Sequence, residues 1–237
     1  MCNMSDKVNE TIVMSVGGSL IVPDQIDTTF LKNLHNFIIE QTTNHGRRFV
    51  IIAGGGRTAR RYQDAAREVA DLEADDLDWM GIHSTRLNGH LLRTIFRDIA
   101  HPVMVTNPDD VLDAPKNAPL IIAAGYRPGA STDLRAVQIA QRVGAKKVVN
   151  LSNTDYIYSE NPKDNPDATK FETISWTEFR KLIPDKWDPG LSSPFDPVAA
   201  QESEKLKLEV ASINGKNLEQ LKLYLDNQTF VGTKIFH

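Results

Sequence analysis

Three glycine-rich segments contain residue types suited to binding an anion. Residues 17–19 read Gly-Gly-Ser, residues 54–60 read Gly-Gly-Gly-Arg-Thr-Ala-Arg, and residues 125–133 read Gly-Tyr-Arg-Pro-Gly-Ala-Ser-Thr-Asp. Glycine lets backbone N–H groups approach an oxyanion closely, and a helix N-terminus behind such a turn favours negative charge. Arg60 adds a guanidinium one helical turn later. We therefore expect a site for phosphate-bearing ligands.

Each segment also has a simpler explanation when it is taken alone. A glycine turn can be purely structural, and Ser131, Thr132 and Asp133 are good capping and first-turn residues of a helix. Neither glycine run matches Gly-x-Gly-x-x-Gly or the Gly-Lys-Ser/Thr of a Walker loop. Residues 152–162 form a fourth polar segment, which could be an ordinary hydrophilic loop. The hypothesis of a ligand site therefore depends on these segments meeting in space.

Buried strands and amphipathic helices alternate along the chain and would position these segments. Expected strands cover residues 11–16, 48–53, 102–105, 119–123, 146–151, 207–213 and 233–236. Expected helices begin at about Asp27, run from the second glycine segment to about residue 70, and cover about residues 75–98, 131–143, 176–183, 198–205 and 217–225. Residues 161–167 and 185–197 are expected to be irregular because they are rich in Pro, Gly or polar residues.

This alternation lacks hairpin signals and predicts an α/β fold with a mainly parallel central sheet between two layers of helices. Ligands of such sheets bind at the carboxyl ends of the strands. The three glycine segments each follow an expected strand, so the site is expected at that edge. A weak boundary lies near Val143, but no flexible linker is apparent there. We therefore expect a single domain, residues 1–237, with an N-terminal lobe of about residues 1–143 and a C-terminal lobe of about 144–237.

The composition is typical of a folded globular protein. The chain has 237 residues, 41% of them hydrophobic and 24% charged, and a net charge of −4. A mildly acidic chain without a long basic run is unlike a general nucleic-acid binder. One cysteine, Cys2, cannot form an internal disulfide, and neither a membrane-spanning run nor a signal peptide is apparent. We expect a cytoplasmic protein, without nucleic-acid or membrane partners and without a protein-borne metal site.

Taken together and in this order, the motifs resemble the archaeal-type UMP kinases of the amino-acid kinase superfamily. The resemblance spans nearly the whole chain. It rests on residues 17–20, 54–62, 78–88 (Asp-Trp-Met-Gly-Ile-His-Ser-Thr-Arg-Leu-Asn), 125–133, 152–155 with Tyr158, 162–163, 195–200 and 232–235.

The resemblance implies a three-layer αβα sandwich that transfers the γ-phosphoryl group of ATP to UMP, giving UDP and ADP with Mg²⁺. This reaction belongs to pyrimidine nucleotide biosynthesis. UMP would bind on the side of the N-terminal lobe and ATP on the side of the C-terminal lobe. The family also forms homohexamers, so a homo-oligomer is expected.

The resemblance also implies site residues. Asp133 would organise the catalytic centre and Arg60 would meet the transferring phosphates. Asp78 would bond the ribose hydroxyls of UMP. The full set expected at UMP is Gly55, Asp78, Tyr126, Arg127, Pro128, Gly129, Ala130, Ser131 and Thr132. The set expected at ATP is Gly18, Ser19, Gly56, Arg60, Ser152, Asn153, Tyr158 and Asn161.

The chain departs from the superfamily pattern where many members carry lysine: it has Ser15 before the first glycine segment, and Asn150 and Asn153 later. Arg127 or Lys163 is a hypothetical substitute for the missing positive charge. Tyr156 also replaces a glycine near the expected nucleotide base. Two alternatives stay open: a kinase of the same fold with another small acceptor, and a catalytically silent nucleotide-binding protein.

Overall fold

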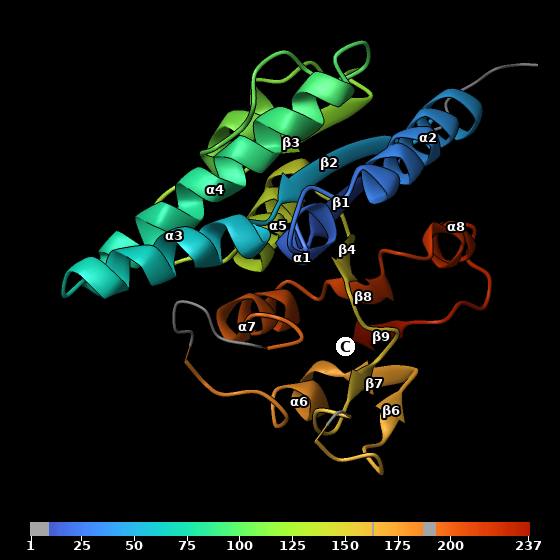
Figure 1. The fold of residues 1–237 in the computed structure, drawn as a ribbon. Coiled ribbons are helices and arrows are strands. Elements are labelled where there is room, and N and C mark those ends of the chain that lie inside the picture. The colour runs from blue at the N-terminus through green and yellow to red at the C-terminus, as the bar shows by residue number, and fades with distance from the viewer. Residues whose placement is uncertain (1–9, 163, 187–192) are drawn as a thin grey trace, which may run out of the picture.

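A single seven-stranded sheet forms the centre of the protein. The computed structural model describes residues 10–162, 164–186 and 193–237 (Figure 1). The strand order is β3-β2-β1-β4-β8-β9-β7. The strands are β1 (Thr11–Val16), β2 (Arg48–Ala53), β3 (Leu120–Ala123), β4 (Lys147–Ser152), β7 (Thr173–Ser175), β8 (Glu209–Asn214) and β9 (Thr233–Phe236). Neighbours from β3 to β8 pair in parallel, whereas β9 runs antiparallel to β8.

The sheet is buried on both faces, which explains why its strands are nearly continuous apolar runs. Side chains alternate between the faces of a strand, so Met14 packs into one core and Val13 into the other. The first core lies under α1 (Gly18–Ile21), α2 (Thr28–His45), α4 (Ala74–Ile95) and α8 (Leu218–Leu225). The second lies under η1 (Pro108–Leu112), α5 (Thr132–Val143), α6 (Trp176–Phe179) and α7 (Pro197–Lys205). The expected three-layer α/β fold is therefore confirmed.

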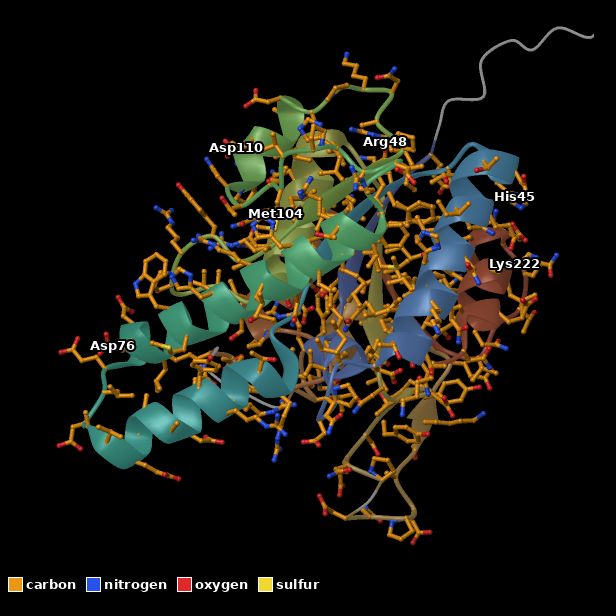
Figure 2. All side chains as sticks on the ribbon, turned by 45° about the horizontal axis from the view of Figure 1, so that its top comes forward. His45, Arg48, Asp76, Met104, Asp110 and Lys222 are labelled. Atoms are coloured by element: carbon orange, nitrogen blue, oxygen red, sulfur yellow. The ribbon has the colours of Figure 1, made fainter. Side chains whose placement is uncertain are left out.

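One helix pair projects from this sandwich. Helix α3 (Gly56–Val69) buries no residue of its own and packs along α4, away from the sheet (Figure 1). Figure 2 places Asp76 at the outer end of this pair, where it completes the capping box of α4. The first turn of α3 and the middle of α4, at Thr85 and Asn88, adjoin the carboxyl edge of the sheet, so the pair forms one wall of the space above that edge.

Most expected elements are present within a few residues of their expected bounds. Asp27 caps α2 as expected, because its carboxylate accepts a hydrogen bond from the Phe30 amide at 2.9 Å. The strand expected at residues 102–105 is wrong. This segment forms only an isolated bridge, between Val105 and Ala123, and it begins with Pro102, which has no N–H to donate. The helix expected at residues 176–183 ends earlier, at Phe179.

The structure also contains one short antiparallel pair for which the sequence carries no hairpin signal. Strands β5 (Ile157–Tyr158) and β6 (Lys170–Phe171) form a small antiparallel pair, and the segment between them is the expected loop of residues 161–167. Strands of two residues are too short to show alternation in a sequence. Of the irregular segment expected at 185–197, residues 187–192 lie outside the described part, and Pro197 begins α7. No described helix is both long and apolar enough to cross a membrane.

Candidate functional site

The first two glycine turns touch each other backbone to backbone at the carboxyl edge of the sheet. A Cβ atom added to Gly18 would lie 2.0 Å from the amide nitrogen of Gly56, and one added to Gly54 would lie 2.3 Å from that of Gly18. Gly56 has a φ of +64°, in the left-handed region that favours glycine. These glycines are therefore required by the contact between the turns, before any ligand is considered.

A cavity of about 370 Å³ opens beside this contact. Its walls come from the turns after β1, β2 and β3 and from α3, α4 and the start of α5, as the sequence predicts. Ten of the predicted site residues line it: Gly18, Ser19, Gly55, Gly56, Arg60, Asp78, Ala130, Ser131, Thr132 and Asp133. Seven further residues complete the lining, namely Gly54, Ala59, Gln63, Gly81, Ile82, Thr85 and Gly125. We call this space the glycine cavity.

Two helices begin at the glycine cavity. Helix α3 starts at Gly56, and α5 starts at Thr132 with the Ser131 hydroxyl accepting a hydrogen bond from the Leu134 amide at 3.1 Å. The first N–H groups of a helix lack intrahelical acceptors and carry a partial positive charge. Both N-termini therefore favour an anion in this space.

The charged side chains that line the cavity have a net negative charge. Arg60 is exposed, and it is the one basic side chain in the lining among the described residues. Two carboxylates, Asp78 and Asp133, belong to the same lining. A bound polyanion would thus depend on backbone amides, Arg60 and a metal ion that it brings with it.

Asp133 is held by two neighbouring elements. Its carboxylate accepts hydrogen bonds from the Ser15 hydroxyl at 2.9 Å and from the Asp196 amide at 3.3 Å. Burial raises the pKa of Asp133 to about 6, and the nearby Asp196 carboxylate adds to the shift. The Ser15 bond opposes it. Ser15, which stands where many superfamily members carry lysine, thus orients the acidic group by a neutral hydrogen bond.

Asp78 connects α4 to the third glycine segment. Its carboxylate accepts a hydrogen bond from the Gly129 amide at 2.8 Å. Burial raises the pKa of Asp78, while this hydrogen bond acts in the opposite direction. A ligand that hydrogen-bonds to Asp78 would therefore lie close to the third glycine segment.

Three positioning residues on α4 lie in the motif at 78–88, but no pattern in the sequence assigns them a role. Asn88 donates from its amide to the carbonyls of Gly54 and Gly55, at 2.7 and 3.2 Å. Thr85 accepts a hydrogen bond from the Gly125 amide at 2.8 Å, and Arg86 donates to the carbonyl oxygens of Gly125 and Tyr126. Together they fix the second and third glycine segments against one helix.

The remaining predicted residues lie outside the glycine cavity. Tyr126 and Arg127 line a different cavity, and Pro128 and Gly129 belong to the connecting loop. Ser152, Asn153, Tyr158 and Asn161 follow one another along the segment from the end of β4 past β5. Lys163, a hypothetical source of positive charge, lies outside the described residues.

The turn after β4 still adjoins the glycine turns, because the Gly17 amide donates to the carbonyl of Leu151 at 2.9 Å. This contact gives the C-terminal segment access to the same edge of the sheet. Nowhere in residues 10–162, 164–186 and 193–237 do three His, Cys, Asp or Glu side chains form a metal-binding group. A metal ion at this edge would therefore need oxygen ligands from a substrate.

Because the turns are in close contact, adding one methyl group at Gly18 should destabilise the protein strongly. Gly18→Ala should lower the free energy of unfolding by about 3 kcal/mol, because the new Cβ has only backbone atoms to displace. Gly81→Ala is a matched control, since its Cβ would lie 3.6 Å from the nearest atom, the Gln63 side-chain nitrogen. Urea unfolding measures both. Equal stability of the two variants would contradict the steric role of Gly18.

The raised pKa of Asp133 predicts a pH dependence of stability. Between about pH 4 and pH 6 the folded protein binds more protons here than the unfolded chain, so the free energy of unfolding falls as the pH rises. Asp133→Asn removes this titration. The stability of the variant relative to wild type should therefore increase by up to about 3 kcal/mol from pH 4 to pH 7. Urea unfolding without nucleotides tests this, and a difference independent of pH would contradict it.

Comparison with known proteins identifies the family of this chain. Residues 10–212 match the amino acid kinase family. The uridylate kinase of Methanospirillum hungatei is 34% identical over 95% of this chain and 94% of its own length, and that of Methanocorpusculum labreanum is 32% identical over 94% of each. The crystal structure of Archaeoglobus fulgidus uridylate kinase, 25% identical, superposes with a TM-score of 0.78 over 94% of this chain and 99% of the other.

The Bacillus anthracis UMP kinase structure, at 17% identity and a TM-score of 0.78 over 96% of each chain, shares the fold. The family match covers most of the chain, and the similarity to named relatives runs almost from end to end. The chain therefore belongs to the amino acid kinase family and stands within it among the uridylate kinases.

Proposed function

We propose that this protein is a UMP kinase, which transfers the γ-phosphoryl group of ATP to UMP and gives UDP and ADP in pyrimidine nucleotide biosynthesis. One observation carries the proposal: glycine turns, two helix N-termini, Arg60 and Asp133 converge on a single cavity, in a chain whose relatives are uridylate kinases. The arrangement suits a phosphate-bearing acceptor better than a neutral one, because helix N-termini favour anions.

UMP is the ligand proposed for the side of the cavity made by the N-terminal lobe, about residues 1–143. Its phosphate would lie near Gly55 and the start of α5, where Ala130, Ser131 and Thr132 line the wall. Its ribose would reach Asp78. The stretch from Tyr126 to Gly129 would contribute by holding that wall in place, since Gly129 is bonded to Asp78.

ATP is proposed to bind from the C-terminal lobe, about residues 144–237. Gly18, Ser19, Gly56 and Arg60 would meet its phosphates. Its nucleoside would lie along the segment that follows β4, where the resemblance places Ser152, Asn153, Tyr158 and Asn161. The bond between Gly17 and Leu151 supports this arrangement, because it brings the start of that segment to the glycine turns.

The proposed mechanism relies on positioning and charge neutralisation. Phosphoryl transfer needs little covalent chemistry from the protein, and two polyanions must be held in line despite their mutual repulsion. Arg60 and the backbone amides would stabilise charge on the transferring group. The carboxylate of Asp133, held by Ser15, fits an ATP-borne Mg²⁺, which keeps several waters and takes one or two protein carboxylates. When bound, the metal would neutralise charge on the phosphates.

Two alternatives remain as outcomes of the test. The net negative charge of the lining side chains is the reason to consider a catalytically silent nucleotide-binding protein. The fold alone would also allow a kinase with another small acceptor. A coupled assay of ADP release with UMP, CMP, AMP and no acceptor separates the three. Fastest turnover with UMP supports the proposal, whereas saturable UMP binding without turnover would favour the silent protein.

The role of Arg60 gives a direct prediction. Removing one such donor typically raises the barrier by about 2.7–4 kcal/mol, so Arg60→Ala should lower kcat by about 100-fold to 1,000-fold. Stability should change little, because Arg60 is exposed. Arg67→Ala, a change of an exposed arginine on the same helix, is the matched control. A folded Arg60→Ala enzyme with most of its activity would rule out this role.

We also propose that the protein is cytoplasmic and assembles as a homo-oligomer, a hexamer by resemblance. Helix α4 offers a surface for this: Ile82 and Leu92 are buried in the subunit, whereas Trp79 and Leu87 are 39% and 62% exposed. Exposed apolar side chains on one helix suit a contact between copies of the chain.

A charge placed on that helix should weaken the assembly. Leu87→Glu is expected to shift the protein from the oligomer to smaller species in sedimentation velocity, because a carboxylate would be buried without a partner. The far-UV circular dichroism of the variant should match wild type, since Leu87 is exposed in the subunit. An unchanged oligomer mass would show that α4 is not the contact.

A further inference from the structure

A second cavity, separate from the glycine cavity, is lined by three arginines. Its volume is about 280 Å³, and Arg127, Arg135, Arg142, Tyr126, Gln138 and Asp109 all line it. No residue of its lining is shared with the glycine cavity. Asp109 comes from η1, the segment that carries Asp110 in Figure 2, and the arginines come from α5 and the loop before it. We call this space the arginine cavity.

Arg135 is the centre of the arginine cavity. It is only 5% exposed, although it carries a full charge. Its terminal nitrogens donate to the Gln138 side chain at 2.8 Å and to the carbonyl of Arg127 at 3.1 Å. Its Nε–H group has no hydrogen-bond partner, and no carboxylate pairs with it, among the described residues. A buried guanidinium normally has a counterion, so this one lacks an anion.

The neighbouring charges increase the need for an anion. The guanidinium groups of Arg127 and Arg135 lie 5.4 and 5.6 Å from the centre of the same Tyr126 ring. Burial, and then the nearby charge of Arg127, lower the pKa of Arg135. The one carboxylate in the lining, Asp109, is paired with Arg142 at 2.6 Å. Three guanidinium groups against one carboxylate leave a net charge of +2 around the cavity.

We propose that the arginine cavity binds a phosphate group, either free phosphate or the phosphate of a small metabolite. A tetrahedral dianion matches the charge of the cavity and can accept hydrogen bonds from more than one guanidinium. A carboxylate carries one charge and accepts bonds in one plane, so it fits three arginines less well. The site stands on its own contacts, and its existence does not depend on whether the chain phosphorylates UMP.

In the test, the buried Arg135 Nε–H group reports a change of charge in the cavity. In ¹H–¹⁵N spectra of the full chain, the Arg135 Nε–H signal, assigned by its loss in Arg135→Lys, should shift saturably as inorganic phosphate is added. Methyl phosphate is the second arm. Tighter binding of methyl phosphate would point to a phosphorylated metabolite, and tighter binding of inorganic phosphate would point to the free ion. A signal that does not move with either ligand would overturn the proposal.

Two variants should change the affinity for phosphate in opposite directions, so a loss of folding could not explain both results. Arg142→Gln removes a cation and should weaken phosphate binding about tenfold, whereas Asp109→Asn removes the competing carboxylate and should strengthen it. Arg67→Gln is the matched control and should leave the affinity unchanged, since Arg67 also lies in an exposed ion pair, with Asp64 at 3.1 Å. Equal affinities in Arg142→Gln and Arg67→Gln would mean that phosphate binds elsewhere, and the site would be rejected.

Discussion

The contact between two glycine turns is the constraint on which the rest of the site depends. The turns after β1 and β2 approach so closely that a single Cβ at Gly18 or Gly54 would overlap backbone atoms. This approach sets where α3 begins, because Gly56 is both part of the contact and the first residue of that helix. Asn88 then ties α4 to the same turns through the carbonyls of Gly54 and Gly55. The glycine cavity is the space that these fixed backbones leave.

Electrostatics then decide what that space can hold. Backbone amides and helix ends supply positive potential without bulk, while the charged side chains of the lining sum to a negative value. A polyanion accompanied by a metal ion is compatible with both features, and a metal-free polyanion would be less favourable beside Asp78 and Asp133. Ser15 illustrates the same balance. Its hydroxyl keeps Asp133 oriented but supplies no charge, so the positive potential around this space comes from Arg60 and the backbone amides.

The loop at residues 125–133 serves two cavities. Its second half, from Ala130 onward, lines the glycine cavity, while Tyr126 and Arg127 face the arginine cavity. Arg86 holds the first carbonyls of the loop, and Arg135 holds that of Arg127. Three consecutive carbonyls at the start of the loop, those of Gly125, Tyr126 and Arg127, are thus held by arginines from two helices.

The sequence by itself determined the α/β class, most of the helices and strands, and the convergence of the three glycine segments on one edge. These follow from local periodicity and from the rule that parallel strands end at the same edge. Short or proline-interrupted segments, such as residues 102–105 and the β5–β6 pair, could not be predicted because they carry too few residues to show a period. Only the tertiary structure decided that Gly18 and Gly54 face each other, that Ser15 bonds to Asp133, and that Arg127 turns toward Arg135 instead of the glycine cavity. These are contacts between residues far apart in the chain, or choices between the two sides of a loop, and both are set by packing that no local pattern records.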